Sequence, residues 1–222
     1  MRINKYIAST GLCSRRSADQ LIEQGKVKIN GKIAIQGDRV EDGQEVFVDG
    51  KLIRNDQDKV YIAFHKPYGV IVTDAENATN KARDYIDIEK RLFAVGRLDV
   101  NSTGLLICTN DGDVVNLLSK AENKIEKEYL VVVKENVTPV FLQKMSEGVR
   151  LDEGKTLPAH VKKHGHKGFL ITLVQGWNRQ IRRMCEKLGY QVVSLKRVRF
   201  GKMELGNLQV GEWRYIKKND LL

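Results

Sequence analysis

The residue with the clearest chemical potential is Asp99, which lies in the segment VGRLDVNSTG at positions 95–104. Glycines at both ends of this segment, Gly96 and Gly104, let the backbone turn tightly and approach a ligand. Arg97 precedes the carboxylate by two residues and would favour its charged form. An ionised aspartate in a partly closed pocket can act as a nucleophile or a base. An aspartate on a glycine-bounded turn is also a common structural feature, so the segment alone leaves both interpretations open.

Two apolar strands, expected at residues 93–95 and 105–109, must hold this loop. Loops supported by a rigid sheet are where reactive groups are usually displayed. From residue 60 onward, strand and helix patterns alternate along the chain. Further strands are expected at 60–64, 129–133, 169–174 and 191–195, and helices at 82–88, 113–119, 139–145 and 179–188. This mixture predicts an α+β domain with a mostly antiparallel mixed sheet flanked by helices.

The N-terminal segment has a different pattern, which predicts a small separate αα-β unit. Helical spacing of apolar residues predicts one helix that stops at Thr10-Gly11 and a second that Ser14 caps and Gly25 ends. An Asn-Gly turn predicts a hairpin over residues 27–33, and a strand is expected at 45–48. The polar stretch 54–59 is the candidate linker. The expected domains are therefore residues 1–56 and 57–222.

The 222 residues carry a formal net charge of +10, which indicates a polyanionic partner, most often nucleic acid. Basic residues gather in two regions, and a solvated basic face is the alternative for each. Before residue 33, only Asp19 and Glu23 oppose Arg2, Lys5, Arg15, Arg16, Lys26, Lys28 and Lys32. Between residues 175 and 203, only Glu186 opposes Arg179, Arg182, Arg183, Lys187, Lys196, Arg197, Arg199 and Lys202. Apart from Arg182, the second group is expected to supply salt-sensitive attraction that does not read sequence.

Four motifs, in their order along the chain, resemble those of one enzyme family. They are Lys66-Pro67-x-Gly69, the segment GRLDVNSTGLL at 96–106, Glu128-Tyr129-Leu130-Val131, and the segment GWNRQIRRM at 176–184. The chain resembles the pseudouridine synthases, in the branch that acts on ribosomal RNA of the small and large subunits. Residues 2–7 and 13–16 are similar to the S4-type RNA-binding domain that precedes the catalytic domain in this branch.

The resemblance implies roles for the matching residues. Asp99 corresponds to the catalytic aspartate, which either attacks C1′ of uridine or removes a sugar proton, so that uracil detaches, rotates and rejoins through C5. Tyr129 corresponds to the tyrosine that stacks under the target base, and Arg182 to the basic residue that pairs with the aspartate. Residues 171–173 would contact the uracil face. Substrate or RNA binding is expected from Arg97, Lys66, Arg179, Arg183, Arg15, Arg16 and Lys5.

The implied reaction is an isomerisation that needs no metal and no redox cofactor, so none is expected. The implied partner is ribosomal RNA, in the form of a structured stem-loop with a flipped-out uridine. RNA of the large subunit is favoured, and transfer RNA is left open as a further substrate. The alternative is a non-catalytic RNA-binding or ribosome-assembly factor with the same fold. The two differ at Asp99, because a binder would tolerate asparagine there. No segment is typical of an association helix, so a monomer is expected.

Other chemistries have little support in the sequence. His160, His164 and His166 have a spacing that could bind a metal, but lysines surround them and the segment is expected to be a surface turn. Neither a phosphate-binding glycine loop nor a dinucleotide fingerprint is present. Three distant cysteines without a C-x-x-C motif fit a reducing compartment. With no secretory signal at its start and no apolar run near ~20 residues, the chain is expected in the cytoplasm and not in a membrane.

Overall fold

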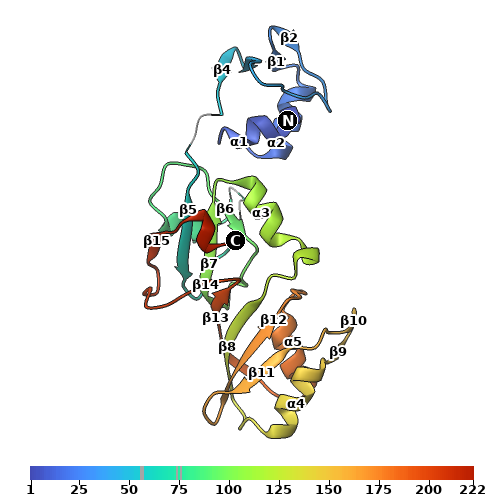
Figure 1. Ribbon diagram of the computed structural model, residues 1–222, viewed down its shortest axis with the longest axis vertical. Coiled ribbons are helices and arrows are strands. Elements are labelled where there is room, and N and C mark those ends of the chain that lie inside the picture. The colour runs from blue at the N-terminus through green and yellow to red at the C-terminus, as the bar shows by residue number, and fades with distance from the viewer. Residues whose placement is uncertain (56–57, 74, 76) are drawn as a thin grey trace. The chain divides into compact units, whose positions relative to one another are not determined.

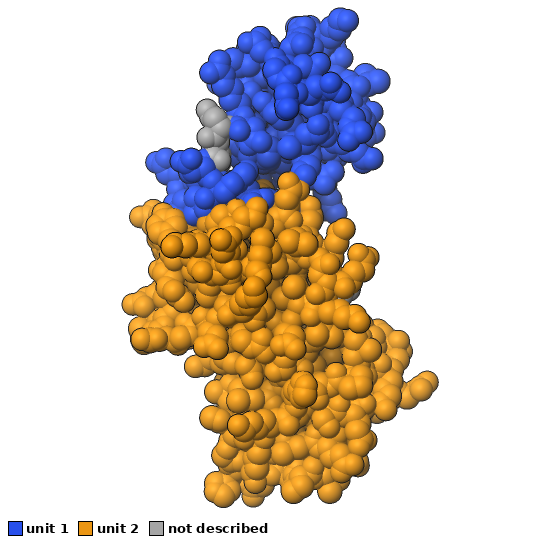
Figure 2. Space-filling view, viewed as in Figure 1, with its two compact units in different colours: residues 1–60, 88–91, 110–112 blue, residues 61–87, 92–109, 113–222 orange. Residues whose placement is uncertain are grey.

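A computed structural model describes residues 1–55, 58–73, 75 and 77–222, and these form two compact units. The smaller unit comprises residues 1–60, 88–91 and 110–112, and the larger comprises residues 61–87, 92–109 and 113–222 (Figure 2). The linker predicted at 54–59 includes positions 56 and 57, which lie outside the described residues. Each unit has hydrophobic clusters of its own.

The smaller unit begins with two short helices, α1 (Ile3–Ser9) and α2 (Arg15–Glu23), as the sequence predicts (Figure 1). The Ser14 side chain accepts a hydrogen bond from the backbone N–H of Ser17 at 3.0 Å, which confirms the predicted N-cap. Gly11 follows α1 with a positive φ of 85°, the backbone geometry of a helix C-terminus. The apolar faces of both helices pack on the adjoining strands through Ile3, Ile7, Ala18 and Ile22.

A four-stranded antiparallel sheet completes this unit, in the order β2-β1-β3-β4. The hairpin of β1 (Val27–Ile29) and β2 (Lys32–Ile33) turns at Asn30-Gly31, where both residues have positive φ, as predicted. The next strand, β3 (Val46–Val48), also matches the prediction. The fourth strand, β4 (Lys51–Ile53), was not predicted; it pairs with β3 through a second tight turn at Asp49-Gly50.

The larger unit is built on a sheet in which the described residues form nine strands. All pairings but one are antiparallel; β7 and β13 run parallel, which confirms a mostly antiparallel mixed sheet. The strand order is β11-β12-β8-β13-β7-β5-β15, with β14 also paired to β13 and β6 to β7. The bounds are β5 Tyr61–Lys66, β6 Phe93–Val95, β7 Thr103–Thr109, β8 Lys127–Val133, β11 His160–Lys163, β12 Gly168–Leu173, β13 Val192–Phe200, β14 Met203–Glu204 and β15 Trp213–Tyr215.

The helices of this unit cover the sheet and are mostly close to their predicted positions. Thr138 caps α4 (Pro139–Glu147), accepting from the N–H of Phe141 at 3.2 Å. The helix expected at 82–88 is only a single 3₁₀ turn, η1 (Ala82–Tyr85). The remaining elements are α3 (Gly112–Ser119), η2 (Ala121–Asn123), α5 (Gln180–Lys187), η3 (Lys218–Asp220) and the small hairpin β9 (Arg150–Leu151) and β10 (Gly154–Lys155).

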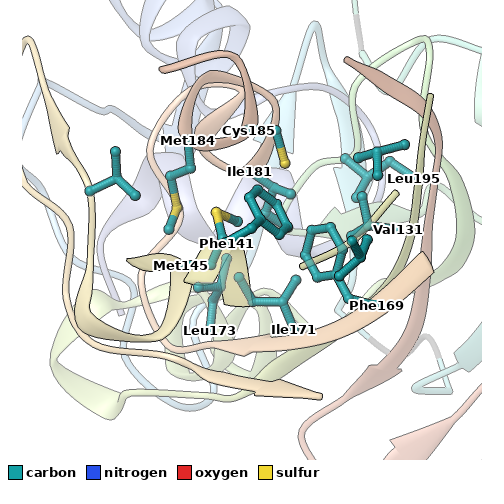
Figure 3. Packing of buried hydrophobic residues seen from close by; sticks show 13 residues of the cluster. Val131, Phe141, Met145, Phe169, Ile171, Leu173, Ile181, Met184, Cys185 and Leu195 are labelled. Atoms are coloured by element: carbon teal, nitrogen blue, oxygen red, sulfur yellow. The ribbon is translucent and has the colours of Figure 1, made fainter. Parts of the chain in front are cut away.

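One hydrophobic cluster fixes α4 and α5 against β8, β12 and β13 (Figure 3). Phe141 of α4 contacts the Phe169 ring edge-on at 5.3 Å and stacks on Tyr190 at 3.8 Å. Met184 of α5 is fully enclosed in the same cluster, and Ile181 of the same helix is buried in it apart from a small part that faces the cleft. Because this packing removes much apolar surface from water, α5 has a fixed position on the sheet. The first turn of α5 carries several of the residues predicted for the functional site.

The segment that contains the three histidines differs from its prediction. A surface turn was expected there, but His160 begins the edge strand β11, which pairs with β12 over His160–Lys163. The turn itself follows, at Gly165 with a φ of 74°. Among the residues that the structure describes, no three His, Cys, Asp or Glu side chains gather as they would around a metal ion.

Candidate active site

A cleft of about 520 Å³ opens in the larger unit beside the Asp99 loop. It is bounded by the segment between β6 and β7, by one face of β8 and by the connection between β12 and α5. Asp99 and Tyr129 both line it, so the structure brings together two of the three residues predicted to be catalytic. The other lining residues are Ile71, Val72, Arg97, Leu98, Val100, Asn101, Ser102, Leu173, Gln175, Gly176, Trp177, Asn178, Arg179, Gln180, Ile181 and Leu195.

The loop that carries Asp99 is held by a hydrogen bond within the loop and by two more from the end of β5 and the residues that follow it. The Asp99 carbonyl accepts from the N–H of Ser102 at 3.0 Å, which closes a tight turn. The next carbonyl, that of Val100, accepts from the N–H of Gly69 at 2.9 Å and from Lys66 Nζ at 3.4 Å. These contacts fix the backbone at Asp99 and Val100, so the position of the carboxylate is determined by the sheet and not by the loop alone.

Lys66 is completely buried at the end of β5, although it was predicted to bind RNA. Its ammonium group donates to the carbonyls of Pro67 at 2.9 Å and Val100 at 3.4 Å. Burial lowers the pKa of Lys66 from 10.5 to about 8, and the negative charge of Asp99 opposes this shift. Lys66 therefore supports the Asp99 loop from behind and places positive charge close to the carboxylate.

Arg182, the third predicted catalytic residue, lies next to the loop without lining the cleft. Its Nη2 donates to the Asn101 carbonyl at 2.5 Å; within the described part of the chain it forms no ion pair with the Asp99 carboxylate. Burial and the like charge of Arg179 lower the pKa of Arg182, whereas Asp99 raises it. Arg182 lines a second hollow, of about 460 Å³, together with Arg179 and the segment from Gly189 to Val192.

Four elements, β8, β12, β13 and α5, contribute to the apolar part of the cleft. Tyr129 of β8 lies opposite Ile171 of β12 in the sheet, and Leu173 follows two residues later. Leu173 lines the cleft, whereas Ile171 is fully enclosed in the hydrophobic cluster. Residues 171–173 were predicted to contact the uracil face; of Ile171 and Leu173, only Leu173 lines the cleft. Ile181 and Leu195 complete the apolar surface, which suits the face of a planar ring.

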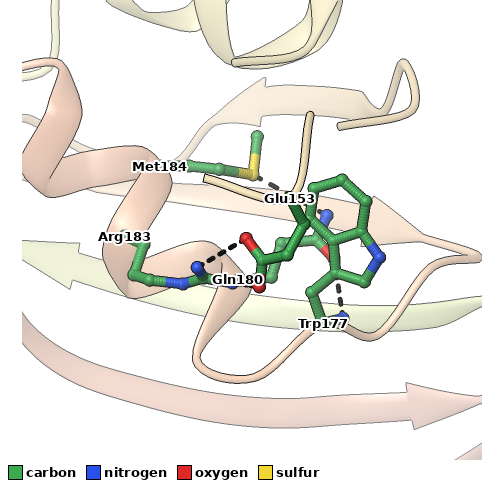
Figure 4. A network of polar contacts seen from close by, with 5 residues as sticks. All are labelled: Glu153, Trp177, Gln180, Arg183 and Met184. Carbon is green, nitrogen blue, oxygen red and sulfur yellow. Dashed lines mark hydrogen bonds and ion pairs between the residues drawn. The ribbon is translucent and has the colours of Figure 1, made fainter. Parts of the chain in front are cut away.

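A network of polar contacts shapes the connection between β12 and α5 (Figure 4). The Gln180 side chain accepts from the N–H of Trp177 at 3.0 Å, and Arg183 donates to both carboxylate oxygens of Glu153 at 2.7 and 2.8 Å. Arg179, at the start of α5, has a left-handed backbone with φ 48°, an uncommon conformation for arginine. Arg183, predicted to contact RNA, is thus engaged in a bidentate ion pair, while Arg179 is exposed and lines the cleft.

Two other arginines differ from the predicted basic face. Arg197 is only 2% exposed and donates from Nε to the Leu105 carbonyl at 2.7 Å, and Arg199 pairs with Glu126 and Glu128. Both side chains therefore hold strands together and cannot act as freely solvated charges. These partners could not be found by counting nearby acidic residues, because the Leu105 carbonyl lies 92 residues before Arg197 and Glu126 lies 73 residues before Arg199.

The remaining predicted residues fall in two places. Arg97 is exposed and lines the cleft beside Asp99. Arg15 and Arg16 are exposed at the start of α2 in the smaller unit, and Lys5 lies in α1. Trp177, Gln175 and Val72 line the cleft but were not singled out from the sequence; the motif around Gly176 was the only signal that included Trp177. No helix in the described part of the chain is long and apolar enough to cross a membrane.

Comparisons with known proteins agree with this geometry. Residues 60–187 match the family model of RNA pseudouridylate synthases, and residues 1–46 match the S4 domain. The chain is 46% identical to the dual-specificity RNA pseudouridine synthase RluF of Escherichia coli K12, over all of this chain and 77% of that protein. It is 36% identical to the ribosomal large subunit pseudouridine synthase B of Bacillus subtilis 168, over 99% of this chain and 93% of that protein.

A solved structure shows the same architecture. The crystal structure of a pseudouridylate synthase, 28% identical in sequence, covers all of this chain and 98% of its own with a TM-score of 0.73. The match therefore extends over both units and is not confined to the sheet. With the family model, the relatives and the fold in agreement, the chain belongs to the RNA pseudouridylate synthase family and carries an N-terminal S4 domain.

Proposed function

We propose that this chain isomerises a uridine of ribosomal RNA, in the large subunit, to pseudouridine. The observation that carries the proposal is Asp99, half-buried in a cleft that also holds Tyr129 and lies beside the cationic groups of Lys66 and Arg182. The Bacillus subtilis relative is a ribosomal large subunit pseudouridine synthase by name, which supports the large subunit as the source of the RNA. The name of the Escherichia coli relative refers to dual specificity, so transfer RNA is the second substrate to test.

The chemistry assigns one group to each task. In the first route the Asp99 carboxylate attacks C1′ and N1 leaves with the electrons of the N-glycosidic bond; C5 of the rotated uracil then bonds to C1′ and displaces the carboxylate. In the second route Asp99 removes a sugar proton as N1 leaves, C5 bonds to C1′, and the proton returns to the sugar. In both routes C5 finally loses its proton and N1 gains one. The displaced uracil carries negative charge, which the nearby ammonium and guanidinium groups of Lys66 and Arg182 stabilise. Arg97 is placed at the exposed side of the cleft to hold the substrate. The bonds and protons balance within the nucleotide, so no cofactor is required.

The target base must leave its stack before Asp99 can reach the sugar. Extruding a base costs a few kcal/mol, which contacts inside the pocket must offset. Tyr129 supplies a ring for stacking, and Leu173 and Ile181 supply apolar surface. Arg179 attracts the RNA backbone at the edge of the cleft. A flipped-out uridine in a stem-loop therefore fits this cleft better than a paired one.

The proposed domains are an S4 domain at residues 1–56 and a catalytic domain at residues 57–222. The S4 domain binds the RNA and so brings it to the catalytic domain. Its exposed arginines, Arg15 and Arg16, lie at the start of α2, and Lys5 lies in α1. Helix N-termini with basic side chains bind phosphate without reading base sequence. On this proposal one copy of the chain suffices, because Asp99, Tyr129 and Lys66 all come from the same unit.

Replacing Asp99 with asparagine tests the proposal directly. The variant is expected to form no detectable pseudouridine on unmodified large-subunit ribosomal RNA, because the amide cannot act as nucleophile or base. Its RNA affinity should stay within about threefold of the parent, a difference below ~1 kcal/mol. Pseudouridine mapping and filter binding measure the two quantities. Undiminished turnover in the variant would remove Asp99 from the mechanism.

The same assay separates the enzyme from a non-catalytic assembly factor. An enzyme restores the missing modification when the purified chain is added to ribosomal RNA from cells that lack the gene. An assembly factor binds that RNA and leaves its uridines unchanged. Mapping pseudouridines in ribosomal and transfer RNA from those cells also identifies the modified position.

A further inference from the structure

Tyr68 is an exposed aromatic residue in a segment whose backbone is tied to the Asp99 loop. Its side chain is 67% exposed, although it is flanked by two anchored residues. The Pro67 carbonyl accepts from Lys66 Nζ, and the N–H of Gly69 donates to the Val100 carbonyl, one residue beyond Asp99. The Tyr68 ring is thus displayed from a fixed backbone at a position set by the catalytic loop.

The ring also lies close to Arg182. The Tyr68 hydroxyl acts electrostatically on the guanidinium, raising the pKa of Arg182 against the opposite effect of Arg179. An exposed aromatic ring near a guanidinium group is a combination that proteins use to hold single-stranded RNA: the cation attracts phosphates and the ring stacks on a base. Neither the reaction chemistry nor the stacking role of Tyr129 requires this second aromatic residue.

The other exposed tyrosines of the larger unit are placed differently. Tyr85 packs against the Phe64 ring at 5.9 Å and donates its hydroxyl to Asn80 at 3.0 Å. Tyr215 is 64% exposed on β15, where its ring meets Trp213 edge-on at 5.3 Å. Tyr215 therefore matches Tyr68 in exposure, but β15 is separated from the Asp99 loop by β5 and β7 in the sheet.

We propose that Tyr68 stacks on a nucleobase next to the target uridine and so holds the RNA strand at the mouth of the cleft. The inference rests on the proposed function, because only an extruded uridine leaves the neighbouring base with an uncovered face. A ring at Tyr68 covers that face and offsets part of the unstacking cost. The contact recognises the flat surface of a base and is therefore tolerant of base identity.

The test compares Tyr68→Leu, Tyr68→Phe and Tyr68→Trp with the matched control Tyr215→Leu, each placed in the Asp99→Asn background so that binding is measured without turnover. The probe is unmodified large-subunit ribosomal RNA. Tyr68→Leu is expected to weaken affinity by about fivefold to 100-fold, the equivalent of losing one stacked base. Tyr68→Phe and Tyr68→Trp should keep the parent affinity, and so should Tyr215→Leu.

Fluorescence gives a direct readout of stacking. The tryptophan introduced by Tyr68→Trp should be quenched when RNA is added, whereas one introduced by Tyr215→Trp should not. Unchanged affinity of Tyr68→Leu, or an equal loss in Tyr215→Leu, would overturn the inference. If the chain with Asp99 intact makes no pseudouridine while Tyr68→Leu still loses affinity, the stacking contact stands and the proposed reaction fails.

Discussion

At the scale of single residues, the notable feature is how Asp99 is surrounded. Its own carbonyl accepts a hydrogen bond from the N–H of Ser102, and the adjacent Val100 carbonyl accepts from Lys66 Nζ and the N–H of Gly69. Lys66 carries its charge in a fully buried position, which is costly unless the charge is partnered. The two carbonyl acceptors and the nearby Asp99 carboxylate reduce that cost.

The lowered pKa of Lys66 predicts a specific dependence of stability on pH. The pKa of Lys66 is 10.5 in the unfolded chain and about 8 in the folded chain. Burying the charged lysine therefore lowers the free energy of unfolding, and this penalty has its full size below pH 8. Between about 8 and 10.5 the unfolded chain binds more protons, so this penalty disappears as pH rises. The free energy of unfolding of the parent minus that of Lys66→Met should therefore increase by about 1 to 3 kcal/mol from pH 7 to pH 10.

Urea unfolding of both proteins at the two pH values measures this difference, and titrations shared by both proteins cancel. Lys59→Met is a matched control, because it makes the same substitution at an exposed position. An equal response of the two variants to pH would show that Lys66 does not titrate abnormally.

The sequence was a good guide to Asp99 and a poor one to its arginine neighbours. Asp99 and Tyr129 were identified because their motifs are local, and both line the cleft. Arg183 and Arg197 were expected to supply salt-sensitive attraction for RNA, yet one pairs with Glu153 and the other is buried with a hydrogen bond to the Leu105 carbonyl. Partners of this kind depend on strand order, which a local charge count cannot supply.

At the scale of elements, the parallel contact between β7 and β13 connects the Asp99 loop to the rest of the sheet. Gly104 lies opposite Arg197 in this pair, with a φ of 106°. A Cβ at position 104 would lie 2.2 Å from the Arg197 carbonyl oxygen, far inside contact distance. The glycine at the end of the Asp99 segment is therefore required by close backbone approach as well as by its dihedral angle.

Gly104→Ala is accordingly expected to destabilise the chain by about 3 kcal/mol or more, because backbone atoms on both strands must move apart. Gly189→Ala is the control: Gly189 also has a positive φ, 80°, but nothing lies within 4 Å of its added Cβ. That control should lose only ~1 kcal/mol. Thermal unfolding compares the two variants, and equal losses would mean that dihedral strain alone explains the need for Gly104.

Elements with strong local signals were predicted well, and edge strands were not. The hairpin at Asn30-Gly31 and the helix capped by Thr138 carry their own turn and cap residues. By contrast, β11 and β15 were missed, and both lie at edges of the large sheet. The strand β15 has only three residues and two of them are exposed, so it lacks the alternating pattern that marks a half-buried strand.

At the scale of the whole molecule, the two units have separate hydrophobic cores. The smaller unit encloses Ile7, Ala18 and Val46 in its own cluster, and the described residues that line the cleft belong to the larger unit. On the proposed function, the contribution of the S4 domain to RNA binding can therefore be altered without changing the cleft. The net charge of +10 is distributed over both, so RNA affinity is expected to fall as salt rises.

This division predicts that the double variant Arg15→Ala/Arg16→Ala weakens RNA binding without affecting catalysis on bound RNA. Each lost phosphate contact reduces the slope of log affinity against log salt by about 0.7 to 0.9. The double variant Lys162→Ala/Lys163→Ala removes the same charge from the exposed edge strand β11 and serves as the control. Filter binding is measured from 50 to 300 mM salt, with protein concentrations from ~10-fold below to ~10-fold above the dissociation constant of the parent. Turnover at saturating RNA measures catalysis on bound RNA. If both double variants lower the slope equally, the S4 domain contributes only general charge; if Arg15→Ala/Arg16→Ala alone does so, α2 contacts the RNA backbone directly.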